Sequence, residues 1–202
     1  MLKSLSVDRR VYKSRTALKQ ALLEWMPRKP FSDISITDIV KSADLNRGTF
    51  YKHYTYKEEL LEDLLADVLT DLIQAYRYPY LQHQDFDIQS LSASAIKIFD
   101  HVHAYATVYT LLVSTNILQD FRNTVYQTLK SLYLDDVTNT SPNPMIDKEL
   151  LACYQANAVL GLITEWVQGK FKYSSTYMAE QLLELTRMNR SNEMYHSNLN
   201  SG

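Results

Sequence analysis

Apolar residues recur at helical spacing through most of this chain. Residues 8–26 carry one apolar stripe, and Pro27 ends the helix that this stripe predicts. Residues 55–76 carry too many leucines for a single narrow stripe, which predicts a helix that packs on two sides. Only four glycines and five prolines interrupt the chain. The pattern therefore predicts an all-α protein with about nine helices.

A change in composition after residue 76 indicates two regions. Pro79 and the polar residues 82–84 predict a loop, so we place a boundary near residue 77. Residues 1–76 would form a head with its connecting helix, and residues 77–190 a helical body. The polar residues 191–202 are predicted to be a disordered tail. Five helices are expected in the body, at about residues 89–103, 106–113, 118–134, 145–168 and 176–188.

Two short helices joined by a tight turn are predicted between residues 35 and 54. Ser35 is a suitable N-cap for the first helix, and Asn46 for the second. Asp44 lies where the chain must turn, and Asp tolerates left-handed backbone angles better than most non-glycine residues. Phe50 and Tyr54 are four residues apart, so they should be buried on one face of the second helix. This is the pattern of a helix-turn-helix, whose second helix can lie in the major groove of DNA.

The remaining faces of the second helix are basic and hydroxylic. Gly48 costs about 1 kcal/mol of helix propensity relative to Ala, but it would let the backbone approach DNA closely. We expect Arg47 and Thr49 to lie nearest the bases. The residues expected to contact phosphates are Ser35, Tyr51, Lys52 and Lys57, and His53 could take either role. The predicted DNA-contacting residues are Ser35, Thr37, Asn46, Arg47, Gly48, Thr49, Tyr51, Lys52, His53 and Lys57.

The distribution of charge favours DNA contact at one end of the chain. The net charge is −2, yet residues 1–60 hold 12 Lys and Arg against 7 Asp and Glu. Residues 61–202 hold 9 Lys and Arg against 16 Asp and Glu. A basic head on an acidic body directs the head, and not the body, toward a phosphate backbone.

The run Arg47-Gly-Thr-Phe-Tyr51, followed by Lys57-Glu-Glu-Leu60, resembles the motif of the TetR family of bacterial transcriptional regulators. The resemblance covers about residues 8–75. It implies a homodimer that binds a near-palindromic duplex DNA operator, and a body that binds an unidentified small-molecule effector. Most members are repressors released by such a molecule and some activate transcription. The sequence therefore leaves open whether this chain represses or activates. The alternative is an adaptor or activator of the same fold whose partner is a protein.

Three residues in the head depart from the family pattern. Asp44 replaces the family's turn glycine, and Tyr54 replaces its usual phenylalanine. Tyr56 lies where a small capping residue is common, so we expect Thr55 and Glu58 to form a capping box one position earlier. These changes concern local geometry, because none of them removes a predicted DNA-contacting group.

The body contains aromatic residues on helices that should surround a common interior. Tyrosine and tryptophan combine apolar surface with one hydrogen-bonding atom, which suits a ligand cavity as well as a packed core. A tyrosine-rich cavity would favour an amphipathic or aromatic effector. The candidate ligand-binding residues are Phe99, Tyr105, Tyr109, Tyr126 and Trp166.

Small and apolar residues on the last two predicted helices would let a second copy of the chain approach closely. Residues 155–169 also resemble, over a short stretch, a TetR subgroup that includes regulators of dihydroxyacetone kinase operons. The candidate dimer-interface residues are Ala158, Gly161, Leu162, Leu182 and Leu185.

Other kinds of chemistry find little support in the sequence. No hydrolase, zinc-protease or phosphate-loop motif occurs, so we expect no enzyme activity, no catalytic residue and no cofactor. His101 and His103 are two residues apart on a predicted helix and His83 lies in a predicted loop, which disfavours a metal site. No long uncharged apolar run predicts a membrane span. The single cysteine, Cys153, suits a reducing cytoplasm.

Overall fold

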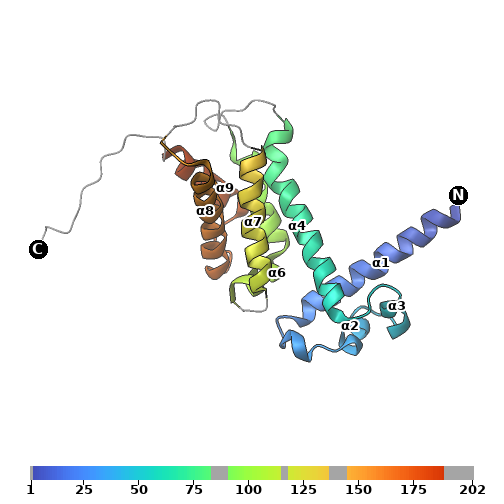
Figure 1. Cartoon of the computed structure of the whole chain (residues 1–202). Coiled ribbons are helices and arrows are strands. Elements are labelled where there is room, and N and C mark those ends of the chain that lie inside the picture. Colours follow the sequence, from blue (N-terminus) through green and yellow to red (C-terminus); the bar gives the residue numbers. More distant parts are fainter. Residues whose placement is uncertain (1, 83–90, 115–117, 137–144, 189–202) are drawn as a thin grey trace, which may run out of the picture.

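The computed structural model describes residues 2–82, 91–114, 118–136 and 145–188 (Figure 1). Within these ranges the regular structure is entirely helical, as the sequence predicts. The α-helices are α1 (Leu2–Trp25), α2 (Ile36–Ser42), α3 (Arg47–Tyr51), α4 (Lys57–Gln82), α5 (Ile98–Ala104), α6 (Ala106–Ser114), α7 (Gln119–Asp136), α8 (Lys148–Gln168) and α9 (Ser175–Met188). Two single turns of 3-10 helix, at Phe31–Asp33 and Ala93–Ala95, precede α2 and α5.

The helices form a head and a body that are joined by α4 (Figure 1). The head consists of α1, α2 and α3 at one end of α4, and the body consists of α5 to α9. In the body α7 packs against α8, α6 against α8, and α5 against α9. Since α4 contacts α1 in the head and both α5 and α7 in the body, it is the connecting helix that the sequence predicts.

One hydrophobic core runs through both regions. It includes Leu22 of α1, Phe50 of α3, Val68 of α4, Tyr109 of α6 and Val125 of α7, all of which are inaccessible to solvent. Burying an aliphatic or aromatic side chain of this size contributes about 1.5–3 kcal/mol. The head and the body are therefore stabilised by the same continuous cluster.

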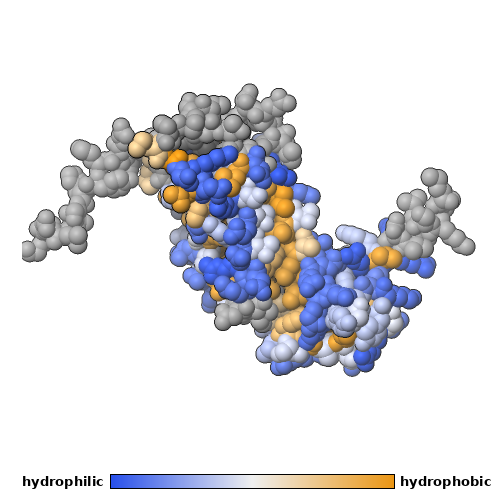
Figure 2. Space-filling view, in the orientation of Figure 1, coloured by the Kyte–Doolittle hydropathy of each residue, from blue (hydrophilic) through white to orange (hydrophobic). Residues whose placement is uncertain are grey.

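Polar residues and a hydrophobic band divide the visible surface. Polar residues cover most of the head in the view of Figure 2, and a hydrophobic band follows α4 toward the head. Leu61, Leu65 and Leu69 of α4 follow one another at four-residue spacing and are half-buried. Together with the buried leucines on its other side, this row explains why α4 carries too many apolar residues for one stripe.

Some boundaries differ from the sequence prediction. α4 continues through Pro79 to Gln82, so the predicted domain boundary near residue 77 falls inside this helix. Pro79 removes one intrahelical hydrogen bond, as it would anywhere beyond the first turn, and α4 ends three residues later. α1 begins at Leu2 instead of near Asp8, and α5 is a short helix preceded by a 3-10 turn. The predicted tail at 191–202 lies outside the described residues.

The start of α4 also differs in detail. The Thr55 amide donates a hydrogen bond to the Glu59 carboxylate at 2.6 Å. The acidic residue that reaches back is therefore Glu59, and not Glu58 as the sequence predicts. The reason is that the helix begins at Lys57, which places Glu59 in its first turn on the side of Thr55.

Of the described helices, α8 alone has the length and mean hydropathy (1.2) of a candidate membrane span. It packs against α6, α7 and α9. Core helices of soluble proteins have the same length and composition, so these properties do not by themselves indicate a membrane protein.

Candidate nucleic-acid interface

A complete capping box holds the start of α2. The Ser35 hydroxyl accepts a hydrogen bond from the Asp38 amide (3.1 Å), and the Asp38 carboxylate accepts one from the Ser35 amide (2.9 Å). Lys29 donates to the same carboxylate at 2.8 Å. This bond from Lys29, with those from Ser35, lowers the pKa of Asp38 well below its usual range. The predicted position of Ser35 at the helix start is confirmed, and the cap orients α2 relative to the preceding turn.

The turn between α2 and α3 has the conformation that the sequence predicts. Asp44 has a φ of 52°, in the left-handed region. Asn46 caps α3, because its side-chain oxygen accepts hydrogen bonds from the Thr49 amide (2.8 Å) and the Thr49 hydroxyl (3.1 Å). A Cβ at Gly48 would lie 3.2 Å from this oxygen. Glycine therefore leaves room for the cap, a constraint that the sequence pattern does not reveal.

α3 has a buried side and an exposed side. Phe50 is completely buried and Tyr54 is 6% exposed, which confirms the predicted inward face. Arg47, Tyr51 and Lys52 are exposed. The Arg47 guanidinium lies 3.3 Å from the Tyr51 hydroxyl, to which it donates a hydrogen bond. This outward surface combines positive charge with hydrogen-bonding groups, so it can contact both base edges and phosphates of a duplex.

His53 faces α1. Its Nε2 atom lies 2.7 Å from the Ser14 hydroxyl. Burial lowers the pKa of His53, and the positive charges of Arg15 and Lys52 lower it further. The imidazole is therefore mainly neutral at pH 7. It positions α3 against α1 and, when neutral, adds no charge for DNA. This positioning role depends on a contact between distant parts of the sequence.

Lys57 makes hydrogen bonds within the protein. Its ammonium donates to the carbonyls of Phe31, Ser32 and Ile34 at 2.7, 2.8 and 2.9 Å. An ammonium has three protons, so all its donors are used by the turn that precedes α2. Lys57 thus has a structural role in the head, whereas the sequence predicts only a phosphate contact for it. Thr37, another predicted contact, is half-buried in α2.

A charged network joins the end of the helix-turn-helix to α1 and α4. Asp63 of α4 accepts hydrogen bonds from Tyr54 (2.6 Å) and Arg15 (2.5 Å) and lies 2.8 Å from the Lys19 ammonium. Lys19 also pairs with Asp67 at 2.5 Å. Burial raises the pKa of Asp63, but the bonds from Arg15, Lys19 and Tyr54 outweigh burial and leave that pKa well below its usual range. The hydroxyl by which Tyr54 differs from phenylalanine therefore has a specific partner.

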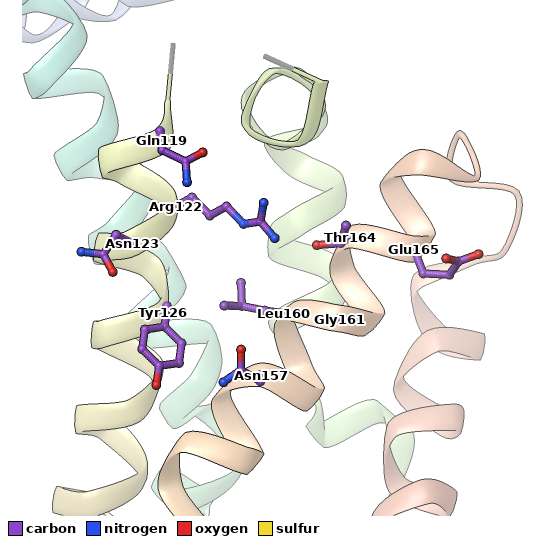
Figure 3. A pocket seen from close by; sticks show the side chains of 9 residues that line it. All are labelled: Gln119, Arg122, Asn123, Tyr126, Asn157, Leu160, Gly161, Thr164 and Glu165. Carbon is purple, nitrogen blue, oxygen red and sulfur yellow. The ribbon is translucent and has the colours of Figure 1, made fainter. Parts of the chain in front are cut away.

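The five aromatic residues predicted to bind an effector do not surround one cavity. Phe99 and Trp166 pack against each other in the core, with ring centroids 5.7 Å apart. Tyr109 is completely buried, and the Tyr105 hydroxyl donates to a carboxylate of α4. Tyr126, the remaining member, lines a groove between α7 and α8 (Figure 3). Most of these rings fill the core, which is the packed-core alternative of the sequence analysis, and their role in binding an effector stays a prediction.

Two groups that could bind metals or react with oxidants have ordinary structural surroundings. Cys153 is half-buried, and its sulfur accepts a hydrogen bond from the Tyr126 hydroxyl at 3.2 Å. His101 is buried, and burial lowers its pKa to about 4. Among the residues that the structure describes, no three His, Cys, Asp or Glu side chains gather as a metal site requires. His83 lies outside them.

The predicted dimer-interface residues lie on α8 and α9 with different exposure. Gly161 and Leu185 are exposed, whereas Ala158, Leu162 and Leu182 are half-buried. No described atom lies within 4 Å of the place where a Cβ at Gly161 would stand, beyond the helix's own backbone. The surface of α8 is therefore open at this glycine.

Comparisons with known proteins agree with this geometry. The sequence profile described as "Bacterial regulatory proteins, tetR family" matches residues 20–64, and "Transcriptional regulator C-terminal region" matches residues 89–188. A curated relative, the uncharacterized HTH-type transcriptional regulator YxbF of Bacillus subtilis strain 168, is 25% identical over 162 residues, which are 80% of this chain and 41% of the relative. The chain thus spans about two fifths of the length of that relative.

Solved structures share the fold. A putative TetR-family transcriptional regulator from Syntrophomonas wolfei strain Goettingen has a TM-score of 0.64 at 18% identity, over 92% of this chain and 99% of that one. The dihydroxyacetone kinase operon activator DhaS has a TM-score of 0.62 at 17% identity, over 87% and 95%. NalD of Pseudomonas aeruginosa, a secondary repressor of a multidrug efflux pump, has a TM-score of 0.58 at 18% identity, over 91% and 100%.

The two matched profiles cover the head and the body, and both describe transcriptional regulators and not enzymes. The helix-turn-helix has its two caps, its left-handed turn and a basic outward side on α3. The chain belongs to the TetR family of transcriptional regulators.

Proposed function

We propose that the protein regulates transcription in a bacterial cytoplasm by binding a near-palindromic duplex as a homodimer. The observation that carries the proposal is the outward side of α3. Arg47, Tyr51 and Lys52 are exposed there above the buried Phe50, and Asn46 caps the helix start. Arginine forms two hydrogen bonds to guanine in the major groove, whereas lysine suits a phosphate.

The surface of α8 and α9 supports the homodimer. Leu150 of α8 is 69% exposed, and Tyr177 and Leu185 of α9 are each 40% exposed. A two-fold arrangement of these helices would bury the apolar residues of both copies. It would also present two equivalent recognition helices, which match an inverted repeat.

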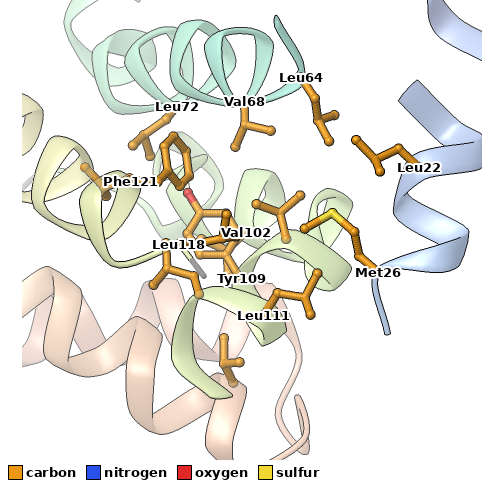
Figure 4. Packing of buried hydrophobic residues seen from close by; sticks show 14 of the residues in the cluster. Leu22, Met26, Leu64, Val68, Leu72, Val102, Tyr109, Leu111, Leu118 and Phe121 are labelled. Atoms are coloured by element: carbon orange, nitrogen blue, oxygen red, sulfur yellow. The ribbon is translucent and has the colours of Figure 1, made fainter. Parts of the chain in front are cut away.

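The packing between head and body offers a path for an effector signal. Figure 4 shows Leu22 of α1 and Met26, the residue directly after α1, in the same cluster as Leu64 and Val68 of α4 and Leu111 of α6. A body ligand with different affinities for two arrangements of these helices shifts their populations. Because the contacts are packed side chains, a shift of α4 or α6 would change the position of the head.

We propose that the protein is a repressor released by a small molecule. The alternative is an activator, or an adaptor, whose partner is a protein. The likeness to DhaS, which is named as an activator, favours the activator. Expression of a reporter from the bound promoter separates them. Deletion of the gene should raise expression if the protein represses, and lower it if the protein activates.

The proposed function is tested by selecting bound duplexes from a random library. We expect an inverted repeat whose half-sites follow the spacing of about one helical turn or its multiples. Affinity should fall steeply with salt, because bound lysine and arginine displace counterions from phosphates. Lys52→Ala should reduce the salt dependence, whereas Lys172→Ala in the body should not. Enrichment of only asymmetric or single-stranded sites would overturn the proposal.

A further inference from the structure

The groove between α7 and α8 has the chemistry of a polar binding site (Figure 3). Its volume of about 370 Å³ lies within the range of small-molecule sites. Leu160 contributes an apolar part of its wall. The hydrogen-bonding side chains that converge on it are Gln119, Arg122, Asn123 and Tyr126 of α7 and Asn157 and Thr164 of α8.

Arg122 gives the groove its positive charge. Figure 3 shows its guanidinium extending across the groove toward Thr164. Within the described part of the chain, no carboxylate lies at ion-pair distance from Arg122, whereas Lys130 of the same helix is paired with Glu149 at 2.7 Å. Glu165 also lines the groove, but its carboxylate is directed away from Arg122 in Figure 3. A guanidinium in this position can bind a carboxylate or a phosphate through two parallel hydrogen bonds.

The shape of the groove depends on one small residue and one hydrogen-bonded group. Gly161 keeps the α8 side open, because nothing occupies the space near its Cβ position. One turn earlier on α8, Asn157 donates to the sulfur of Cys153 at 3.5 Å, and Tyr126 of α7 donates to the same sulfur at 3.2 Å. These bonds hold the two side chains in place without a ligand, so part of the site is preformed.

We propose that this groove binds a small hydrophilic acid. Its carboxylate or phosphate would pair with Arg122, and its hydroxyl or amide groups would bond to Asn123 and Asn157. Binding of the acid does not depend on the proposed function, but its effect on DNA binding does. A ligand that joins α7 to α8 would act on α4, because α7 packs against α4. It differs from the aromatic effector that the sequence favours, because the aromatic rings fill the core and the open volume lies beside polar side chains.

Thermal-shift titrations of the whole chain test the proposal with three acids: malate, gluconate and glucose 6-phosphate. Uncharged glucitol and apolar decanoate are the comparison compounds. At least one acid should raise the melting temperature with increasing concentration. Its apparent dissociation constant should rise at least about tenfold in Arg122→Gln, because a charged hydrogen-bonded pair is lost. Lys130→Gln removes a paired charge from the same helix and should stay within about twofold. Comparison of malate and gluconate, which carry carboxylates, with glucose 6-phosphate shows which acidic group the site binds.

A second measurement uses the single cysteine of the chain. Reaction of Cys153 with a disulfide reagent should slow when the stabilising acid is present, and this protection should be absent in Arg122→Gln. The inference is overturned if no acid at about 10 mM stabilises the protein, if Arg122→Gln responds like wild type, or if only decanoate stabilises. DNA binding without any acid response would refute this inference alone, and the proposed function would stand.

Discussion

Replacing Tyr54 with phenylalanine isolates one hydroxyl that joins the head to α4. The hydroxyl donates to the Asp63 carboxylate at 2.6 Å and lies 3.3 Å from Nε of Arg15, which donates to it. The ring itself is 6% exposed and packs against Phe50, with centroids 5.8 Å apart. The substitution keeps this packing and removes only the polar contacts, so any loss of stability can be assigned to them.

The expected loss follows from the surroundings of Asp63. A hydrogen bond to a charged group contributes about 1.5–3 kcal/mol to stability. Asp63 keeps Arg15 and Lys19 in the variant, so its charge is not left unpaired. We therefore expect a loss near or below the low end of this range, about 1–2 kcal/mol. For a chain of this length that corresponds to a fall of roughly 2–8 °C in melting temperature at constant protein concentration.

The effect should depend on pH in a defined direction. The folded-state pKa of Asp63 lies below its unfolded value, so its contribution is present above about pH 4 and is lost as the pH falls toward the folded-state pKa. Burial raises the pKa of Tyr54 to about 12, and the bond to Asp63 raises it too. That contribution is present below the unfolded pKa of about 10 and is lost as the pH rises through the folded pKa. The difference between wild type and Tyr54→Phe should thus be largest from just above the folded-state pKa of Asp63 to about pH 10.

Melting curves of wild type and Tyr54→Phe, recorded from pH 3 to 9, test this reasoning. Tyr51→Phe is the matched control, since it removes a hydroxyl that is exposed and contacts only Arg47 among described groups, at 3.3 Å. The control should change stability by less than about 0.5 kcal/mol. If Tyr54→Phe melts with the control at pH 7, the Asp63 contact is not the source of stability. The difference from wild type should persist at pH 3, because Asp63 of the folded protein is still ionised there.

Four further substitutions have definite expected outcomes. Arg47→Ala should weaken specific binding by about 1–3 kcal/mol and relax the preference at one position of each half-site, as measured by isotherms on site variants. Lys57→Met should lower the melting temperature, because three carbonyls lose a charged donor; a salt slope reduced by about one would instead show a phosphate contact. Asp44→Gly should raise stability by up to about 1 kcal/mol in denaturant titrations, since a φ of 52° is unfavourable for residues with a Cβ. Ala158→Glu should give monomers in sedimentation, and a wild type that is already monomeric at micromolar concentration would contradict the dimer.

The helix-turn-helix could be predicted in detail because its signals are local. Ser35 and Asn46 bond to amides three residues away, and the conformation of Asp44 is set by the turn itself. The inward face also follows from spacing, since Phe50 and Tyr54 lie one helical turn apart. Such features need only a few neighbouring residues to be correct.

The partners of individual polar side chains could not be predicted in the same way. Lys57 bonds to carbonyls more than twenty residues away, and His53 meets Ser14 across 39 residues. The aromatic content likewise did not distinguish a cavity from a core. A tryptophan such as Trp166 looks the same in the sequence whether it lines a cavity or is buried in the core, as it is here. The groove beside Tyr126 exists because of how α7 and α8 are spaced, and no residue type reports that spacing.

The continuous core has a consequence for how such regulators can be recombined. Met26, directly after α1, and Leu111 of α6 belong to one cluster although they come from the head and the body. A chimera that joins this head to the body of a distant relative would bring together surfaces that were never matched, and a mismatch of one methylene group is already felt in a close-packed interior. The unit that can be exchanged intact therefore includes α4 and the residues of α6 that belong to this cluster. Its edges follow the packing and not the position along the chain.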